Sequence, residues 1–463
     1  MLLDLKDTIV ALSTPSGSGA IAMIRMSGEK AFEIVQQYIN KNVSESETHT
    51  AHFVRFEDKG DLIDECVVTI FKAPSSYTTE NIVELTCHAS PFIIRYILNC
   101  LLTSGARLAA PGEFTQRAFL NGQMDLAQAE AVSDLIASSS ASQHQLALNQ
   151  MKGGVSNKVR SLRQQLIEFA SLIELENDFG EEDVEFVDRF ALSAQVEDVL
   201  TFTNSLLRSF EYGDAIKKGV PVAIVGEPNV GKSTLLNALL QEDKAIVSEI
   251  PGTTRDVIED IIQIEGFLFR FIDTAGIRDT EDTVESLGIQ RTFEQIEKAK
   301  IILFLVEFSE DYKSIADQIQ KHKLLDSQRC IVVLNKVDLY NHACHSYDVE
   351  EAVSTLLGKT KTILLSAKNG DGLEQLKSEL VQILDSMKIN DQSAIISNLR
   401  HVEALEKTKT SLQDVKSGLD NNIPSDLVAI DLRRALNYLG EISGEISTDD
   451  LLESIFSNFC IGK

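Results

Sequence analysis

A glycine-rich turn set between an apolar run and a helical pattern is the sequence feature that most limits what this chain can fold into. The run Val220 to Val225 predicts a buried strand, and the turn Gly226 to Ser233 reads Gly-Glu-Pro-Asn-Val-Gly-Lys-Ser. Helical spacing then appears in Leu235, Leu236, Leu239 and Leu240. This order is typical of a phosphate-binding loop, whose amides and helix N-terminus hold phosphate oxygens. The flanking strand and helix argue against the alternative, a chance match in a glycine-rich turn.

The two residues that end the turn have the chemistry that a nucleotide triphosphate needs. The Lys232 ammonium can reach the β- and γ-phosphates, and the Ser233 hydroxyl can ligate Mg²⁺. Further along, Gly252-Thr253-Thr254-Arg255-Asp256 offers a threonine that can complete the Mg²⁺ shell. Asp273-Thr274-Ala275-Gly276 follows a predicted strand, and its carboxylate can hold Mg²⁺ through water while the Gly276 amide contacts the γ-phosphate.

Two more motifs predict recognition of a guanine base. A carboxylate at Asp338, in Asn335-Lys336-Val337-Asp338, can accept both N–H groups on the guanine edge, while the Lys336 stem covers the ring. Adenine would leave that carboxylate unpaired, which discriminates strongly against it. Ser366-Ala367-Lys368 closes the base pocket through backbone amides. Each motif alone fits an ordinary turn, but five in this order predict a guanine-nucleotide site.

Hydrolysis also requires a group that orients water and a group that compensates charge. Ile277, which follows Gly276, cannot orient water, so we expect Glu285 to do so; the alternative is a solvated loop carboxylate. The Asn229 amide oxygen can help bind a monovalent cation beside the phosphates, or it can serve as an ordinary turn asparagine. We therefore expect the catalytic groups to be Glu285, Lys232 and Asp273.

Composition limits the class of protein. The 463 residues suffice for about three domains, and no apolar run approaches the roughly 20 residues that cross a bilayer. We expect a cytoplasmic protein with six reduced cysteines and no secretory signal. The net charge of −27 argues against non-specific adhesion to nucleic acid or membranes, although a local patch or a partner protein can still present an RNA.

The predicted secondary structure changes several times along the chain. Residues 1 to about 120 predict a mixed α/β domain, with strands at Asp7–Leu12, Glu65–Phe71 and Ile82–Thr86 and a helix at Pro91–Leu102. Gly17-Ser18-Gly19-Ala20-Ile21-Ala22 resembles a dinucleotide fingerprint, but we expect Ile21–Met26 to be a strand, which excludes that site. Residues from 125 are helical, and those of roughly 217–386 alternate strand and helix as in a doubly wound α/β domain. Its remaining strands are predicted at Phe269–Ile272, Ile301–Val306, Cys330–Leu334 and Thr362–Leu365. The tail from 387 is helical again, and Ser447-Thr448-Asp449-Asp450 is a capping-box start for the last helix.

The whole chain resembles the MnmE (TrmE) family of tRNA-modification GTPases, within the TrmE-Era-EngA-like GTPases. The resemblance is carried by Asp7-Thr8-Ile9-Val10-Ala11, Arg25-Met26-Ser27-Gly28, Pro111 to Phe119, Asp125 to Ala131, and the terminal Phe459-Cys460-Ile461-Gly462-Lys463. It implies a multidomain α/β protein: an N-terminal α+β folate-binding and dimerisation domain (1–121), a discontinuous α-helical domain (122–216 and 387–463), and an inserted Ras-like G domain (217–386).

The resemblance also implies an activity. With the FAD-dependent partner MnmG (GidA), in a heterotetrameric or larger complex, a homodimer of the chain would hydrolyse GTP. It would add a carboxymethylaminomethyl or aminomethyl group to C5 of the wobble uridine, position 34, of certain tRNAs. The carbon would come from a tetrahydrofolate derivative, 5-formyl or 5,10-methylene, and K⁺-dependent pairing of two G domains would drive hydrolysis.

The resemblance also implies which residues of this sequence bind folate, metal ions and GTP. Folate contacts fall on Arg25, Glu84, Gln123 and Lys463, although Gln123 replaces an expected basic residue and supplies no charge. The Mg²⁺ ligands would be Ser233 and Thr254, and the K⁺ ligands Asn229, Ser248, Ile250 (through its carbonyl) and Thr253. The whole GTP site would comprise Asn229, Val230, Gly231, Lys232, Ser233, Thr234, Ser248, Glu249, Ile250, Pro251, Gly252, Thr253, Thr254, Asp273, Thr274, Ala275, Gly276, Asn335, Lys336, Asp338, Ser366, Ala367 and Lys368.

Several reactive side chains stay open to more than one interpretation. Cys460 occupies a position that could hold a nucleophile, but a small buried hydrophobe at a helix end is an equal alternative. His88 and the cluster His342-Ala343-Cys344-His345 match no standard zinc spacing and fit loop residues better. The alternative function is a ribosome-assembly or regulatory GTPase switch that binds RNA, but such a protein would be expected to carry a basic RNA-binding module, which we do not find.

Overall fold

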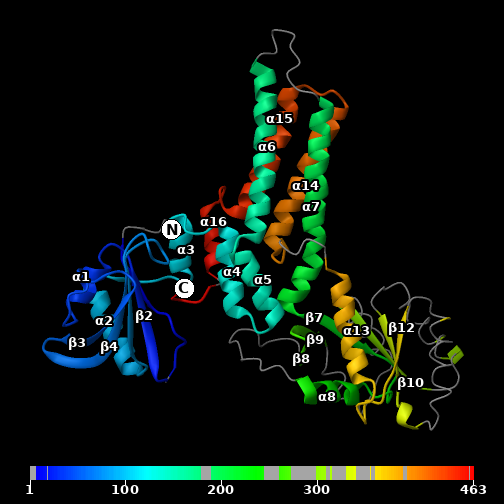
Figure 1. Ribbon diagram of the computed structural model, residues 1–463, viewed down its shortest axis with the longest axis horizontal. Helices are drawn as coiled ribbons and strands as arrows, with labels where there is room; N and C mark the ends of the chain where they lie inside the picture. The colour runs from blue at the N-terminus through cyan, green and yellow to red at the C-terminus, as the bar shows by residue number, and fades with distance from the viewer. Residues whose placement is uncertain are drawn as a thin grey trace. The chain divides into compact units, whose positions relative to one another are not determined.

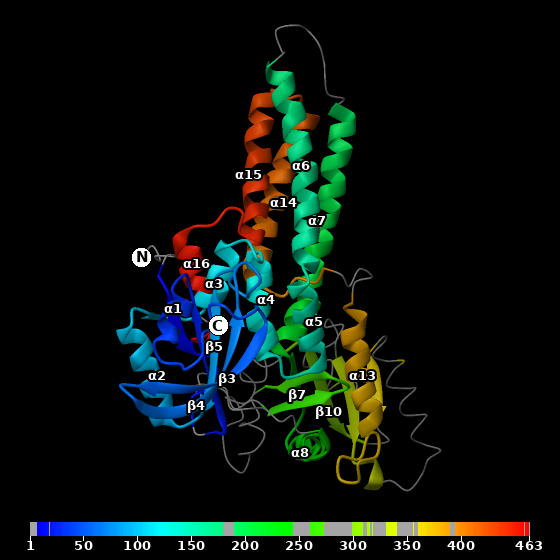
Figure 2. The same ribbon diagram turned by 60° about the vertical axis from the view of Figure 1, so that its left-hand side comes forward.

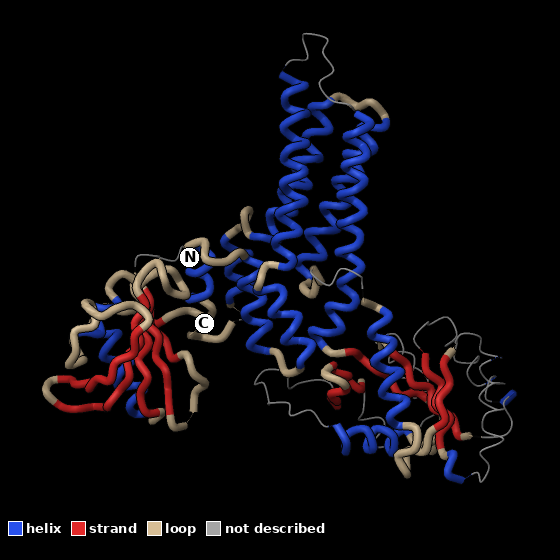
Figure 3. The backbone as a smooth tube through the Cα atoms, in the orientation of Figure 1, coloured by secondary structure: helices blue, strands red, loops and turns tan. Residues whose placement is uncertain are grey.

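The computed structural model describes two compact units. Unit 1 comprises residues 1–133, 150–199 and 404–463, and unit 2 comprises residues 134–149 and 200–403. The described residues are 7–17, 19–178, 189–243, 260–272, 299–308, 313–314, 317, 330–339, 355, 360–388, 394–457 and 459–462. Figure 1 labels most of the helices and several strands, and Figure 3 separates helices from strands by colour. None of the described helices combines the length and the apolar character needed to cross a membrane.

Unit 1 begins with a six-stranded sheet in the order β3-β4-β5-β2-β1-β6. Its strands are β1 (Ile9–Leu12), β2 (Ile21–Ser27), β3 (Thr50–Asp58), β4 (Asp61–Phe71), β5 (Ile82–His88) and β6 (Arg107–Leu108). Neighbours are antiparallel except β1 and β6, which are parallel. The strand at Ile21 confirms that the glycine pair before it opens no helix, so the dinucleotide site is excluded.

Helices cover this sheet unequally. On one face, α1 (Ala31–Gln36) and α2 (Pro91–Thr103) bury Ile34, Ile97 and Leu101 against the apolar side of the strands. On the other face, Phe114 of α3 (Glu113–Leu120) packs on the β1 residues Ile9 and Ala11. Strand β1 is therefore buried from both sides, whereas much of the rest of this second face stays open.

The remaining helices are α4 (Leu126–Ala137), α5 (Ala141–Met151), α6 (Gly154–Asp178), α7 (Arg189–Lys218), α14 (Leu399–Asp420), α15 (Ser425–Ser443) and α16 (Asp449–Phe456). In unit 1, α6 lies along α15, as both views show (Figures 1 and 2), and Arg163 donates to the Leu436 carbonyl at 3.3 Å. Lys416 of α14 pairs with Glu197 of α7. Segments far apart in the sequence thus form one helical body, which confirms the discontinuous helical domain.

Unit 2 contains a second six-stranded sheet, in the order β12-β11-β10-β7-β9-β8. Its elements are β7 (Val220–Val225), α8 (Lys232–Asp243), β8 (Asp260–Ile264), β9 (Phe267–Phe271), β10 (Ile301–Glu307), β11 (Cys330–Asn335), η3 (Val337–Leu339), β12 (Lys361–Leu364) and α13 (Leu373–Ser386). All neighbouring strands are parallel except β8 and β9. Apolar side chains cover both faces, and α8 and α13 share the face that carries Val222 and Leu303. This is the doubly wound α/β domain.

Most predicted elements are confirmed. The strands predicted from Val220, Ile301 and Cys330 are present, and Thr448 caps α16 by accepting a bond from the Leu451 amide at 3.3 Å. Strands β3 and β8 are additional findings. They lie at sheet edges, where only part of each strand is buried, so neither presents a continuous apolar run.

A buried charge cluster fixes α3 to β1 in unit 1. Arg117 is fully buried, and its guanidinium donates to the Asp7 carbonyl at 2.9 Å and lies 3.1 Å from Glu113 and 3.3 Å from Glu80. The Asp7 carboxylate pairs with Arg117 and, at 2.5 Å, with Arg107. Burial opposes ionisation of Asp7, but the hydrogen bonds and charges of Arg107 and Arg117 outweigh it and lower its pKa.

We expect Arg117→Leu to destabilise unit 1 by about 3–5 kcal/mol, because it removes the buried cation that pairs with Asp7, Glu80 and Glu113. Glu113 keeps a second cation, Arg107, at 2.6 Å. Calorimetric unfolding of the full chain measures the change. The control is Arg55→Leu, which breaks an exposed pair with Glu65 (3.5 Å) and should cost less than about 1 kcal/mol. Equal shifts for the two variants would contradict the structural role of the cluster.

Candidate functional site

The phosphate-binding loop joins β7 to α8 in unit 2, as the sequence predicts. Two close approaches require glycine: a Cβ on Gly226 would lie 2.2 Å from the Leu305 carbonyl oxygen, and one on Gly231 would lie 2.3 Å from Asn335 Nδ2. Asn229 adopts a positive φ of 65°, which asparagine tolerates better than most residues. The loop is therefore packed directly against the carboxyl ends of neighbouring strands.

Lys232 lies within this loop rather than in solvent. Its Nζ donates to the carbonyls of Gly226 and Glu227, both at 2.8 Å. Burial lowers the pKa of Lys232, and the charge of Glu227 acts in the opposite direction. Ser233 and Thr234 follow in the first turn of α8. A phosphate oxygen would offer the ammonium a charged partner in place of two carbonyls, which strengthens the interaction.

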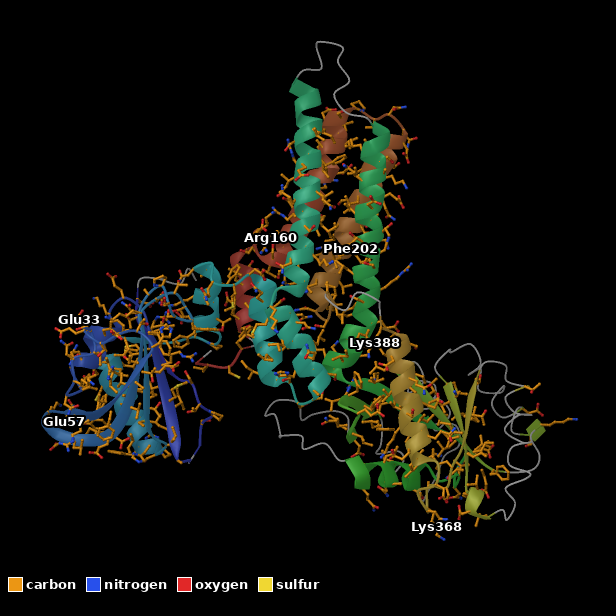
Figure 4. The ribbon with its side chains drawn as sticks, in the orientation of Figure 1. Glu33, Glu57, Arg160, Phe202, Lys368 and Lys388 are labelled. Atoms are coloured by element: carbon orange, nitrogen blue, oxygen red, sulfur yellow. The ribbon has the colours of Figure 1, made fainter. Side chains whose placement is uncertain are left out.

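Asn335 connects three of the predicted motifs. It is the last residue of β11, and its side chain is buried. Its Nδ2 donates to the Val230 carbonyl at 2.8 Å, and its Oδ1 accepts from the Ala367 amide at 3.0 Å. One side chain thus binds the phosphate-binding loop and the Ser366-Ala367-Lys368 segment together; Lys368 is labelled in Figure 4.

The carboxylate predicted to recognise the base has a defined partner. Asp338 is exposed in η3, and its Oδ1 accepts from Ser366 Oγ at 2.7 Å. Ser366 Oγ in turn accepts from the backbone N–H of Asn369 at 3.3 Å. Lys336 has a positive φ of 66°, and its Nζ lies 2.7 Å from Glu307 Oε2 at the end of β10. The structure therefore brings Asp338, Ser366 and Lys336 to one edge of the sheet. No motif pointed to Glu307.

Several predicted site residues lie outside the described residues. They are Ser248, Glu249, Ile250, Pro251, Gly252, Thr253, Thr254, Asp273, Thr274, Ala275, Gly276, Glu285 and Lys463, together with His342, Cys344 and His345. Their assignments stay predictions.

A second candidate site lies on the open face of the unit 1 sheet. Arg25 of β2 and Glu84 of β5 are direct neighbours in the sheet, and Arg25 Nη2 lies 2.8 Å from Glu84 Oε1. The rings of Tyr77 and Phe114 each lie 5.7 Å from the Arg25 guanidinium carbon. Burial raises the pKa of Tyr77 despite its bond to Thr115 and the charge of Arg25. Phe114 belongs to a motif that the sequence already singled out, whereas nothing pointed to Tyr77.

The C-terminal segment also reaches this domain. The Gly462 carbonyl accepts from Ser13 Oγ at 3.0 Å, and the Cys460 carbonyl accepts from the Gly112 amide at 3.4 Å. A Cβ on Gly462 would lie 2.3 Å from the Leu12 carbonyl oxygen, so this contact requires glycine. The Cys460 side chain is exposed, which rules out the buried hydrophobe considered above. Gln123 is exposed at the turn after α3, where its backbone N–H donates to the Ala118 carbonyl at 2.9 Å.

His88 does not form a metal centre among the described residues, which contain no cluster of three ligating side chains. Its Nδ1 lies 2.7 Å from the buried carboxylate of Asp64, and its backbone amide donates to the same carboxylate at 2.9 Å. His88 is thus a partner of Asp64 at the end of β5 rather than a free loop residue.

Comparisons with known proteins agree with this arrangement. A model of the MnmE helical domain matches residues 126–460, and a model of the GTP-binding protein TrmE N-terminus matches residues 8–123. The "tRNA modification GTPase MnmE" of Cytophaga hutchinsonii is 48% identical over 99% of this chain and 98% of that protein. The protein of the same name from Christiangramia forsetii is 49% identical over 100% of both chains.

A more distant solved structure matches part of the chain. Aquifex aeolicus Era bound to GDP·AlF₄⁻ is 28% identical over 41% of this chain and 66% of that chain, with a TM-score of 0.28, too low to support a conclusion. The family models and the full-length relatives are decisive: the chain belongs to the MnmE (TrmE) family of tRNA modification GTPases.

Proposed function

We propose that the chain is a GTP hydrolase that acts in tRNA modification. The observation that carries the proposal is the Asn335 side chain, which binds the phosphate-binding loop to the base-side segment. A triphosphate and a guanine base would therefore meet one preassembled edge of the sheet. The relatives named "tRNA modification GTPase MnmE" match this chain over nearly its whole length, which supports the same role here.

The phosphate side supplies charge and a metal ligand. Lys232 already holds its ammonium inside the loop, so phosphate oxygens would replace the two carbonyls that it now contacts. Ser233 stands in the first turn of α8, and its hydroxyl fits Mg²⁺, a hard cation that prefers oxygen ligands. We infer that Thr254 completes the Mg²⁺ shell and that Asp273 holds it through water. The ion would neutralise charge on the transferring phosphoryl group.

Two further groups are proposed for the hydrolytic step. Glu285 would orient the attacking water, because Ile277 at the usual glutamine position has no polar group. K⁺ would bind through Asn229, Ser248, Ile250 and Thr253 and supply the charge that an arginine finger supplies elsewhere. Asn229 lies in the loop between β7 and α8, beside the place proposed for the phosphates, and its left-handed backbone is one that asparagine adopts readily.

Arg25 and Glu84 are proposed to bind a tetrahydrofolate derivative, with help from Gln123 and Lys463. The residues present fit such a ligand. The Glu84 carboxylate can accept pterin N–H groups, and Arg25 is braced between Tyr77 and Phe114, which reduces the cost of ordering it. When bound, the folate would supply one carbon for C5 of the wobble uridine. FAD would be held by the partner MnmG.

We also propose that the chain forms a homodimer through its N-terminal domain, which we take as residues 1–121. The open face of the sheet exposes Ile21 and Phe53, each 65% accessible, and Phe53 is paired directly with the exposed Val67. Exposed apolar side chains on one sheet face favour protein association. The helical domain would span 122–216 and 387–463, and the G domain 217–386.

Asp338→Ala should reduce the affinity for GDP and GTP by at least about 100-fold, because two N–H groups of guanine lose a charged acceptor. Affinity for ATP should stay equally weak. Titration with fluorescent mant-nucleotides measures both. The control is Asp371→Ala, an exposed aspartate near the same turn that bonds Ser366 through its backbone carbonyl. An unsubstituted chain that binds ATP as well as GTP would refute the base-recognition site.

GTP turnover should be faster in K⁺ than in Na⁺ at equal ionic strength, and Asn229→Ala should erase the difference. The reason is that the two cations differ in size and only one fits the proposed ligand set. Phosphate release in both salts measures the effect. Equal rates for the unsubstituted chain would remove the cation from the mechanism.

Cells that lack the chain should contain tRNA with unmodified wobble uridine, as measured by nucleoside mass spectrometry. Complementation with the unsubstituted gene should restore the modification, whereas Lys232→Ala should not, because the triphosphate loses its charged contact. Normal modification in cells without the chain would instead favour an RNA-binding GTPase switch.

A further inference from the structure

The ends of β10 and β11 carry an ion pair beside the proposed base pocket. Glu307 ends β10 and is paired in register with Asn335, the last residue of β11. Lys336 follows, and its Nζ lies 2.7 Å from Glu307 Oε2. We propose that Glu307 is a positioning residue for guanine recognition, which acts by holding the Lys336 ammonium. This inference rests on the proposed binding of GTP and names a residue that the nucleotide motifs do not contain.

The backbone around Lys336 is already fixed. The Phe308 amide donates to the Asn335 carbonyl at 2.7 Å, and the Val337 amide donates to the Leu365 carbonyl at 3.3 Å. Lys336 itself has a positive φ, an uncommon conformation for a residue with a long side chain. These backbone bonds do not restrict the four-carbon stem of Lys336, which can adopt many rotamers when its ammonium is unpaired. A carboxylate that binds the ammonium removes much of that freedom before the base arrives.

The pair also separates two charges that would otherwise meet. Lys336 and Asp338 are two positions apart, and Asp338 must keep its carboxylate available for the N–H groups of guanine. In the structure Lys336 binds Glu307, while Asp338 accepts from Ser366 Oγ. Without Glu307, the ammonium is free to turn toward the carboxylate of Asp338. A Lys336–Asp338 pair would then compete with the base for the same oxygens.

Stability does not explain the pair. The Lys336 side chain is 30% exposed and that of Glu307 46%, and ion pairs this exposed add little to folding. We infer that the ion pair matters because it lies at the edge of the proposed base pocket and not because it is strong. The expected effect is therefore on nucleotide release and not on unfolding.

The test compares Glu307→Gln with the unsubstituted full chain. The variant keeps the size of the side chain but removes its charge, so mant-GDP should dissociate about fivefold faster, the most that an exposed pair supplies. The unfolding temperature should not change. The matched control is Glu379→Gln, which removes the charge from another pair of unit 2, Lys361–Glu379 at 2.8 Å, and should leave dissociation unchanged.

A double-mutant cycle shows whether the effect passes through the lysine. Lys336→Met keeps most of the stem and removes the ammonium, so Glu307→Gln should add nothing in that background. Additive effects, or an unchanged dissociation rate for Glu307→Gln alone, would overturn the inference while leaving the GTPase proposal intact. An unsubstituted chain that binds no mant-GDP would overturn the GTPase proposal and this inference with it.

Discussion

The hydrogen bonds of Asn335 are the constraint on which the nucleotide site depends. The phosphate-binding loop, the base-recognition turn and the closing segment come from three different strand ends, and sequence order alone does not hold them together. The buried side-chain amide of Asn335 holds them together: it donates to the Val230 carbonyl and accepts from the Ala367 amide, so both of its polar groups are satisfied. The approach is close enough that only glycine fits at position 231. The same side chain thus fixes both the position of the loop and that of the segment beside the proposed base pocket.

A comparable arrangement holds the N-terminal domain together. Arg117 has no exposed surface, and the carboxylates around it come from the segment before β1, from Glu80 and from its own helix. Such a network is costly to bury and costly to break. Arg25 and Glu84 pair with each other outside this network, with side chains 15% and 18% exposed, so the charged residues proposed to bind folate are separate from those that maintain the fold. The two sets can be tested independently.

Sequence reasoning located the elements that carry continuous apolar runs or specific motifs. The parallel strands of unit 2 are of this kind, because burial on both faces leaves an unbroken apolar signal. Edge strand β3 was missed, since polar residues such as His52 and Arg55 interrupt it and only two of its nine residues are fully buried. Contacts across strands leave no local pattern at all. The pairing of Lys336 with Glu307 and the link between Asp64 and His88 depend on neighbouring strands. The aromatic neighbours of Arg25 come from outside the strands, Tyr77 from the connection between β4 and β5 and Phe114 from α3. The resemblance to a known family supplied the folate assignment, which residue types alone do not give.

The bond between Ser13 and Gly462 has a consequence for how the molecule is made. These residues are separated by 449 positions, yet they lie in the same compact unit. Chains generally begin to fold from the N-terminus while the ribosome is still extending them. The first sheet can form early, but it cannot acquire this contact until the inserted G domain and the returning helices have been translated. The first domain can therefore make this contact only after residue 462 has been translated, and a nascent chain that stalls before Gly462 lacks it.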